Sequence, residues 1–110
     1  MPAMRIFTTI PQHNLQASKR SAEAMEIRGF TGICTLENRH DPFLPLAVAA
    51  TSTRAIELST GIALAFVRSP MTIAHISWDL NEASEGRFTL GLGSQIRAHN
   101  EKRFSVPWGP

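Results

Sequence analysis

The sequence predicts an α/β fold in which short parallel strands alternate with longer helices. Four apolar or β-branched runs are expected as strands at 5–10, 32–36, 56–62 and 88–93, and a segment with helical spacing separates each run from the next. Strand–helix alternation places consecutive strands parallel in one sheet. The repeat of roughly 25–31 residues equals one eighth of a ~250-residue (β/α)₈ barrel, but a doubly wound sheet has a similar repeat.

The first strand ends at Pro11, and the first helix is expected over 14–28. Asn14 is a favourable N-cap, and Gly29 stands at the C′ position where a left-handed residue commonly closes a helix. The second strand, 32–36, is apolar enough to be buried on both faces, as in a parallel sheet.

The second and third helices are expected over 42–54 and 70–85. Both begin with a capping side chain followed by proline, Asp41-Pro42 and Ser69-Pro70, and proline is favoured at the first helical position. Gly86 ends the third helix as Gly29 ends the first. Ile73, Ile76, Leu80 and Ala83 give the third helix one apolar face.

Composition indicates a globular, soluble protein rather than a nucleic-acid-binding or membrane protein. Hydrophobic residues make up 43% and charged residues 18% of the 110 residues, and the net charge is +2. No run approaches the roughly 18 apolar residues of a membrane helix, and no signal peptide is visible. The single cysteine, Cys34, suits a reducing compartment. We expect one partial domain over 1–110, with 94–110 as a loop or tail, in the cytoplasm.

In either architecture, chemistry belongs at the carboxyl ends of the strands. The loop after the second strand, 37–41, is the richest there, and Glu37 and His40 are candidates for acid–base work. Asp41 is more simply a helix cap and Arg39 a solvated charge. Basic residues of the tail are candidates for binding an anion, although a solvated loop is the commoner explanation: Arg97, His99, Lys102 and Arg103.

The glycines near the fourth strand do not make a dinucleotide-binding loop, because Ile96 stands where that fingerprint needs a third glycine or alanine. Gly91 and Gly93 instead indicate a place where a ring or a neighbouring helix approaches the strand closely. On sequence alone, Thr60-Gly61-Ile62 is a plain strand end. No histidine has a partner at metal-ligand spacing, so we expect no metal site.

Taken together in order and spacing, four segments resemble the luciferase-like monooxygenase family, and most closely its deazaflavin (coenzyme F-420) dependent branch. They are ENRHDPFLPL (37–46), IELSTGIA (56–63), SPM (69–71) and GRFTLGLGSQ (86–95). The resemblance implies the amino-terminal half of a (β/α)₈ barrel that binds a deazaflavin or FMN at the carboxyl ends of its strands. It also implies a non-proline cis peptide at Gly61–Ile62.

Carried over position by position, the resemblance implies that Glu37 and His40 handle protons. Where related enzymes have Asp-His after the second strand, this chain has Glu-Asn, which leaves the proton donor open. The reaction implied is hydride transfer, or oxygen insertion with a true flavin, on a small organic substrate. The residues implied in cofactor binding are Asn38, Thr60, Gly61, Ile62, Gly93 and Ser94.

The length of the chain bears on activity, because the family barrel continues for four more strands. In such barrels the loops after strands 7 and 8 usually hold the phosphate, so the cofactor tail would be bound elsewhere. We therefore expect a fragment of a longer enzyme that needs a carboxyl-terminal half-barrel or a second copy of itself. The alternative is a non-catalytic remnant or assembly subunit that binds no cofactor on its own. A free-standing nucleotide-binding domain is disfavoured.

Overall fold

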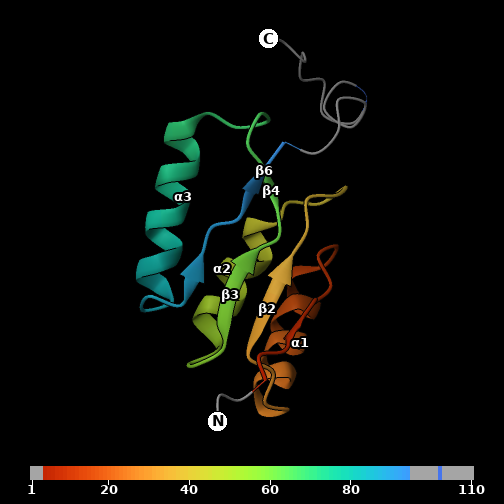
Figure 1. Cartoon of the computed structure of the whole chain (residues 1–110). Helices are drawn as coiled ribbons and strands as arrows, with labels where there is room; N and C mark the ends of the chain where they lie inside the picture. Colours follow the sequence, from red (N-terminus) through yellow and green to blue (C-terminus); the bar gives the residue numbers. More distant parts are fainter. Residues whose placement is uncertain (1–3, 95–101, 103–110) are drawn as a thin grey trace.

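The protein is described by a computed structural model that covers residues 4–94 and Lys102. Three helices alternate with the strands along the chain, as expected (Figure 1). The strands are β1 (Phe7–Thr8), β2 (Gly32–Thr35), β3 (Glu57–Thr60), β4 (Ala63–Leu64), β5 (Phe88–Thr89) and β6 (Leu92–Gly93), and the helices are α1 (Leu15–Ile27), α2 (Phe43–Ser52) and α3 (Pro70–Ala83).

The main sheet has the strand order β1-β2-β3-β5, and every neighbouring pair is parallel. A second pair, β4 and β6, is also parallel and prolongs β3 and β5 toward the carboxyl end (Figure 1). The expected strand 88–93 is therefore two short strands with an interruption, while the expected strand 56–62 contains β3 and β4 follows directly after its predicted end. The parallel alternation confirms the predicted fold class.

The interruption is a bulge on the β3–β4 side. Ser59 pairs with Thr89, and pairing resumes between Ala63 and Leu92. Three residues, 60–62, thus lie opposite two residues, 90–91. An extra residue on one strand bends it and re-aims the side chains beyond it. The expectation of a plain strand end at 60–62, drawn from the sequence alone, is therefore wrong.

The helix ends follow the capping chemistry of the sequence. The Asn14 side-chain oxygen accepts the backbone N–H groups of Gln16 and Ala17 at 2.9 and 3.1 Å. Ser69 Oγ accepts the Thr72 N–H at 3.1 Å, with proline following it in the first turn. Gly29 stands directly after the last capping residue of α1 with φ of +85°, a conformation that favours glycine. At the corresponding position of α3 the left-handed residue is Glu85, with φ of +55°, and Gly86, with φ of +84°, follows one residue later than predicted.

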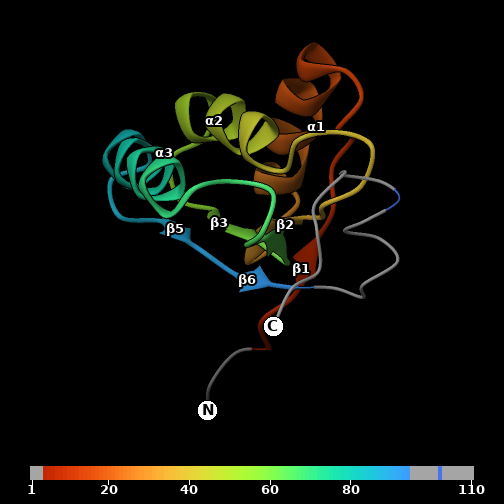
Figure 2. The same ribbon diagram turned by 90° about the horizontal axis from the view of Figure 1, so that it is seen from above.

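The core lies between the sheet and the helices. Ile33 of β2, Leu58 of β3 and Leu46 of α2 are completely buried. Burial of each such side chain contributes about 1.5–3 kcal/mol. α2 lies between α1 and α3 (Figure 2), which explains why it is apolar on most of its surface rather than along one stripe.

All three helices cover the same face of the sheet (Figure 2). In the described part of the chain, neither a helix nor a strand covers the opposite face. Because neighbouring side chains alternate along a strand, Cys34 and Glu57 point to this bare face, as their neighbours Ile33 and Leu58 face the core. Arg5 pairs with Glu57 there at 2.7 Å, and the Phe7 side chain is 40% exposed. The sheet therefore has one face packed against helices and one face on which no described helix or strand packs.

Candidate functional site at the carboxyl ends of the strands

The strands β2, β4 and β6 end at one edge of the sheet, which gathers the expected site residues into one region (Figure 1). The loop after β2 is joined directly to the β4 segment. The Glu37 backbone N–H donates to the Ile62 carbonyl at 3.1 Å. Across the sheet, the N–H groups of Ala63 and Ala65 donate to the Gly91 and Gly93 carbonyls at 2.8 and 2.9 Å.

Glu37 lies deep in this region, and its carboxylate is engaged. The residue is only 7% exposed. Its Oε1 accepts the backbone N–H of Leu64 at 2.9 Å and Arg68 Nη1 at 2.6 Å, while Oε2 accepts Arg68 Nη2 at 3.2 Å. The Glu37 side chain thus connects the loop after β2 to the backbone of β4.

Arg68 is the residue that the sequence interpretation missed. It lies between β4 and α3 and bonds to both carboxylates of the preceding loop, reaching Asp41 Oδ1 at 3.1 Å in addition to Glu37. Its Nη1 also donates to the Leu64 carbonyl at 3.3 Å, and its guanidinium lies 4.9 Å from the Phe43 ring centroid. Burial lowers the pKa of Arg68, but the two carboxylates more than offset this and raise it above its ordinary value. The sequence did contain a signal for Arg68. It directly precedes the Ser69-Pro70 cap, in the loop between a strand and the next helix, and such loops lie at the same edge of the sheet as the acidic loop 37–41.

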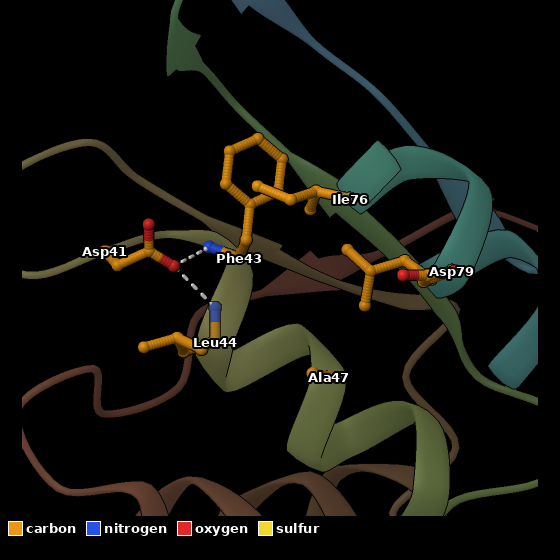
Figure 3. A pocket seen from close by; sticks show the side chains of 7 residues that line it. Asp41, Phe43, Leu44, Ala47, Ile76 and Asp79 are labelled. Atoms are coloured by element: carbon orange, nitrogen blue, oxygen red, sulfur yellow. Dashed lines mark hydrogen bonds between the residues drawn. The ribbon is translucent and has the colours of Figure 1, made fainter. Parts of the chain in front are cut away.

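Asp41 performs the capping role expected of it. Its Oδ2 accepts the backbone N–H groups of Phe43 and Leu44 at 2.7 and 2.6 Å (Figure 3). The helix is assigned from Phe43, one residue later than expected, but the bonds are those of an N-cap. Asp41 therefore links the start of α2 to Arg68.

Asn38 and His40 are exposed, in contrast to Glu37. The Asn38 side-chain oxygen accepts the His40 backbone N–H at 2.8 Å, which closes a tight turn. The Asn38 amide NH₂ and the His40 imidazole take no part in this bond. Both are groups that can donate to or accept from a ligand.

The peptide bond between Gly61 and Ile62 is cis, at the position that the family resemblance implied. The Gly61 N–H donates to the Thr35 carbonyl at 2.7 Å. A Cβ at Gly61 would collide with the Cys34 sulfur, so only glycine fits between β2 and the bulge.

Thr60 is bonded within the sheet rather than presented to solvent. Its hydroxyl accepts the Gly91 N–H at 2.9 Å and donates to the Gly91 carbonyl at 2.8 Å, across the bulge. A Cβ at Gly91 would meet the Thr60 carbonyl, and one at Gly93 would meet the Ile62 side chain. The predicted close approach at these glycines is confirmed, but the approaching groups belong to the neighbouring strand segment and not to a helix. Ser94 is exposed at the end of β6.

The opposite end of the sheet holds a second polar network that the sequence interpretation also missed. Glu26 accepts the backbone N–H groups of Arg54, Ala55 and Ile56 at 2.9, 2.7 and 3.0 Å. Burial raises the pKa of Glu26, but these three hydrogen bonds and nearby Arg87 outweigh it and lower the pKa below its ordinary value.

Arg87 completes this network with five side-chain hydrogen bonds. Its Nε donates to the Ser84 carbonyl at 2.7 Å. Its Nη1 donates to Thr53 Oγ1 and the Ile56 carbonyl, both at 2.8 Å, and its Nη2 to the Ala50 and Thr53 carbonyls, both at 3.1 Å. All the acceptors belong to neutral groups, four of them to the main chain.

A cavity of about 400 Å³ opens in the helical layer between α2 and α3, away from the bulge. The sequence interpretation placed no site there. Figure 3 shows mainly apolar side chains around it, with two carboxylates at the rim. Its lining consists of Asp41, Phe43, Leu44, Ala47, Ile76, Asp79 and Leu80.

The carboxyl edge of the sheet offers both exposed apolar side chains and hydrogen-bonding groups. Ligand pockets combine apolar surface with a few polar groups that orient the ligand. Here Leu36 and Leu92 are each 45% exposed, and Asn38 and His40 offer hydrogen-bonding groups. Within residues 4–94 and Lys102, no three His, Cys, Asp or Glu residues lie close enough together to hold a metal ion. No helix in that part of the chain is both long and apolar enough to span a bilayer.

Part of the expected site lies outside the described residues. The tail residues Arg97, His99 and Arg103, named as candidates for binding an anion, are among them. Lys102 is described and exposed.

Comparison with known proteins gives a consistent result. Residues 4–109 match the family described as luciferase-like monooxygenase. An uncharacterized protein of Mycobacterium tuberculosis is 51% identical over 106 residues, which are 96% of this chain and 31% of that protein. The chain therefore spans less than a third of the curated relatives that it matches most fully.

Solved structures share the fold. The coenzyme F-420 dependent tetrahydromethanopterin reductase from Methanopyrus kandleri has a TM-score of 0.83 at 22% identity, over 97% of this chain and 31% of that chain. The oxygenating constituent of 3,6-diketocamphane monooxygenase from Pseudomonas putida, solved in complex with FMN, has a TM-score of 0.80 at 19% identity, over 94% and 33%. The strands and helices described above are thus similar to about a third of each larger chain.

Proposed function

Because the chain belongs to the luciferase-like monooxygenase family, we propose that it forms the ring-binding part of a flavin- or deazaflavin-dependent oxidoreductase. One observation carries this proposal. The parallel strands direct their carboxyl ends, with Asn38, the Gly61–Ile62 bulge and Ser94, to one edge of the sheet. In (β/α)₈ enzymes, that edge is where chemistry occurs.

The similar structures support a cofactor with a flavin-type ring. One is described as coenzyme F-420 dependent, and the other contains FMN. Such a ring, when bound, supplies hydride transfer or, in a true flavin, reaction with oxygen. The chain's own part is to bind the ring, orient it and control water. The residues proposed to do so are Asn38, Thr60, Gly61, Ile62, Gly93 and Ser94, with Thr60 acting through the strand pairing that holds Gly91.

The two acid–base candidates differ in their surroundings, and this difference favours His40. The Glu37 carboxylate is already engaged by Leu64 and Arg68. His40 is exposed, and its imidazole takes no part in the backbone hydrogen bond to Asn38. An imidazole can both give and take a proton. We assign His40 the proton-handling role, toward a small organic substrate.

The whole enzyme requires more structure than residues 4–94 provide. The chain spans 31% of its curated relatives, and barrels of this kind usually bind phosphate with the loops after strands 7 and 8. We infer that a carboxyl-terminal half-barrel, or a second copy of this chain, covers the bare sheet face. That face also favours a second candidate function: a half-barrel assembly subunit that binds no cofactor on its own.

Titration with the ring cofactors separates the two candidates. The purified 110-residue chain is mixed with FMN and, separately, with a deazaflavin, and quenching of cofactor fluorescence is followed. Ring binding predicts saturable quenching on the order of tens of micromolar. We expect His40→Gln to weaken quenching slightly, by less than about 1 kcal/mol, through the loss of one hydrogen-bonding group.

The exposed His75 of α3 provides the matched control, since His75→Gln makes the same chemical change away from the proposed site. Wild-type chain that quenches neither cofactor would contradict ring binding and support the assembly subunit. Equal quenching by His40→Gln and by wild type would remove that residue from the proposed site.

A further inference from the structure

We propose that Arg68 is a positioning residue of the ring site: with Glu37 it forms a clamp that holds the chain directly after the bulge, residues 62–64. This inference rests on the proposed function, because it assigns the clamp to the wall of the proposed ring site. Arg68 acts through Glu37 and the β4 backbone, and we assign it no contact with the ring.

The first observation is the way Glu37 replaces a missing strand partner. Regular pairing between β2 and β3 ends at Thr35 and Thr60. Beyond that point, Glu37 contacts the next segment twice. Its backbone N–H donates to the Ile62 carbonyl at 3.1 Å, and its carboxylate accepts the Leu64 N–H at 2.9 Å. A side-chain oxygen thus takes the place of a ladder carbonyl.

The second observation is that Arg68 determines where that carboxylate lies. Both carboxylate oxygens of Glu37 bond to the guanidinium, in the fork geometry that fixes orientation as well as distance. The Glu37 side chain is 4% exposed and the Arg68 side chain 14%. A carboxylate this buried requires a charged partner. Removing Arg68 would therefore move the Glu37 side chain away from Leu64.

Arg68 is itself held from three sides, so its position is not free to drift. Asp41, anchored on the first turn of α2, accepts from Nη2 at 3.1 Å. The Leu64 carbonyl accepts from Nη1 at 3.3 Å, and the Phe43 ring lies 4.9 Å below the guanidinium. The clamp therefore connects β4 to the start of α2 as well as to the loop after β2.

The other edge of the β4 segment is held independently. Ala63 and Ala65 donate to carbonyls of Gly91 and Gly93, and these bonds do not involve Arg68. Loss of the clamp would thus release one side of the segment while β4 stays paired with β6. This local release, in contrast to global unfolding, is what makes the proposal testable.

The test is a double-mutant cycle read out in two ways. Arg68→Met, Glu37→Gln and the double variant are compared for amide hydrogen exchange at Leu64 and for the FMN dissociation constant. We expect each single change to speed exchange at Leu64 by roughly tenfold and weaken FMN binding by about tenfold, as loss of a charge-assisted hydrogen bond does. The double variant should be no worse than either single one.

Two further variants separate positioning from general stability. Arg68→Lys keeps one charged contact but not the fork, so we expect it to fall between wild type and Arg68→Met in both measurements. Arg20→Met makes the same change on the exposed surface of α1 and should leave both measurements as in wild type. Exchange at Ala63 and Ala65 reports whether β4 remains paired.

The outcomes are distinct. If wild-type chain binds FMN and Arg68→Met binds it equally well, or if exchange at Leu64 is unchanged, the positioning proposal is overturned while the proposed function stands. Additive losses in the double variant would also overturn it, since they would mean that Glu37 acts without Arg68. If wild-type chain binds neither FMN nor a deazaflavin, the proposed function fails, and the assignment to a ring site fails with it.

Discussion

The two ends of the sheet each carry an arginine and a glutamate in a polar network, but the networks are built differently. At the amino end, Glu26 accepts from three backbone N–H groups, and Arg87 donates mainly to backbone carbonyls. At the carboxyl end, Arg68 bonds chiefly to side-chain carboxylates. At the amino end, the charged side chains bind backbone groups and so connect loops of the fold. At the carboxyl end, the charged side chains bind one another and so fix one another's positions.

This difference agrees with the division of labour in (β/α)₈ barrels, where the amino face serves stability and the carboxyl face serves chemistry. Substitutions at the two ends of the sheet should therefore have different effects on stability and on ring binding. Changes to Arg87 or Glu26 should lower stability without a specific effect on ring binding. Changes to Arg68 should affect ring binding more than the pairing of β4 with β6.

The largest expected loss of stability is that of Arg87→Met. The change leaves several buried carbonyls without a donor, and hydrogen bonds from a charged donor contribute about 1.5–3 kcal/mol each. We expect the free energy of unfolding to fall by at least about 3 kcal/mol, measured by urea denaturation and circular dichroism. Arg20→Met is the control, and an equal denaturation midpoint in the two variants would contradict this role.

An intermediate effect is expected from the glycines opposite the bulge. Gly91→Ala places a methyl group against the Thr60 carbonyl, which is main chain and cannot move aside. We expect a loss of about 1–3 kcal/mol in the free energy of unfolding. Gly93→Ala meets the flexible end of the Ile62 side chain and should cost less. Thermal denaturation of both variants tests the order, and a more damaging Gly93→Ala would refute this geometry.

The smallest expected effect is that of Glu26→Gln, about 1–2 kcal/mol at neutral pH, as for loss of a helix cap. The pKa of Glu26 is lowered in the folded state, so its contribution is complete above the ordinary value of 4.5 and is lost as the pH falls through the folded value. Wild-type stability should thus fall more steeply than that of Glu26→Gln below pH 4.5. Glu82→Gln, exposed on α3, is the control, and parallel pH profiles for Glu26→Gln and wild type would exclude the effect.

Local signals predicted much of the fold. Asn14, Ser69 and Gly29 each perform the role predicted from the sequence, because caps and left-handed residues depend on only a few neighbours. The bulge at 60–62 was not visible to residue-level reasoning, since it depends on the register of a strand about 30 residues later. The cis peptide there was found only through the family resemblance.

The site was less predictable than the fold for the same reason. The loop 37–41 was found because its polar residues are contiguous after a buried strand. Arg68 was missed because its partners, Glu37 and Asp41, lie 31 and 27 residues earlier. Sequence position alone placed Glu37 and His40 on an equal footing. Their burial and contacts, visible only in three dimensions, separate them into a clamp residue and an exposed imidazole.

The most direct test of the account is a map of amide hydrogen exchange in the full chain with and without saturating FMN or deazaflavin. A ring held at the carboxyl edge predicts slower exchange in 36–40, 61–65 and 92–94, and unchanged exchange around Glu26 and Arg87. Protection at the amino end of the sheet, or none at the carboxyl edge with cofactor bound, would contradict it.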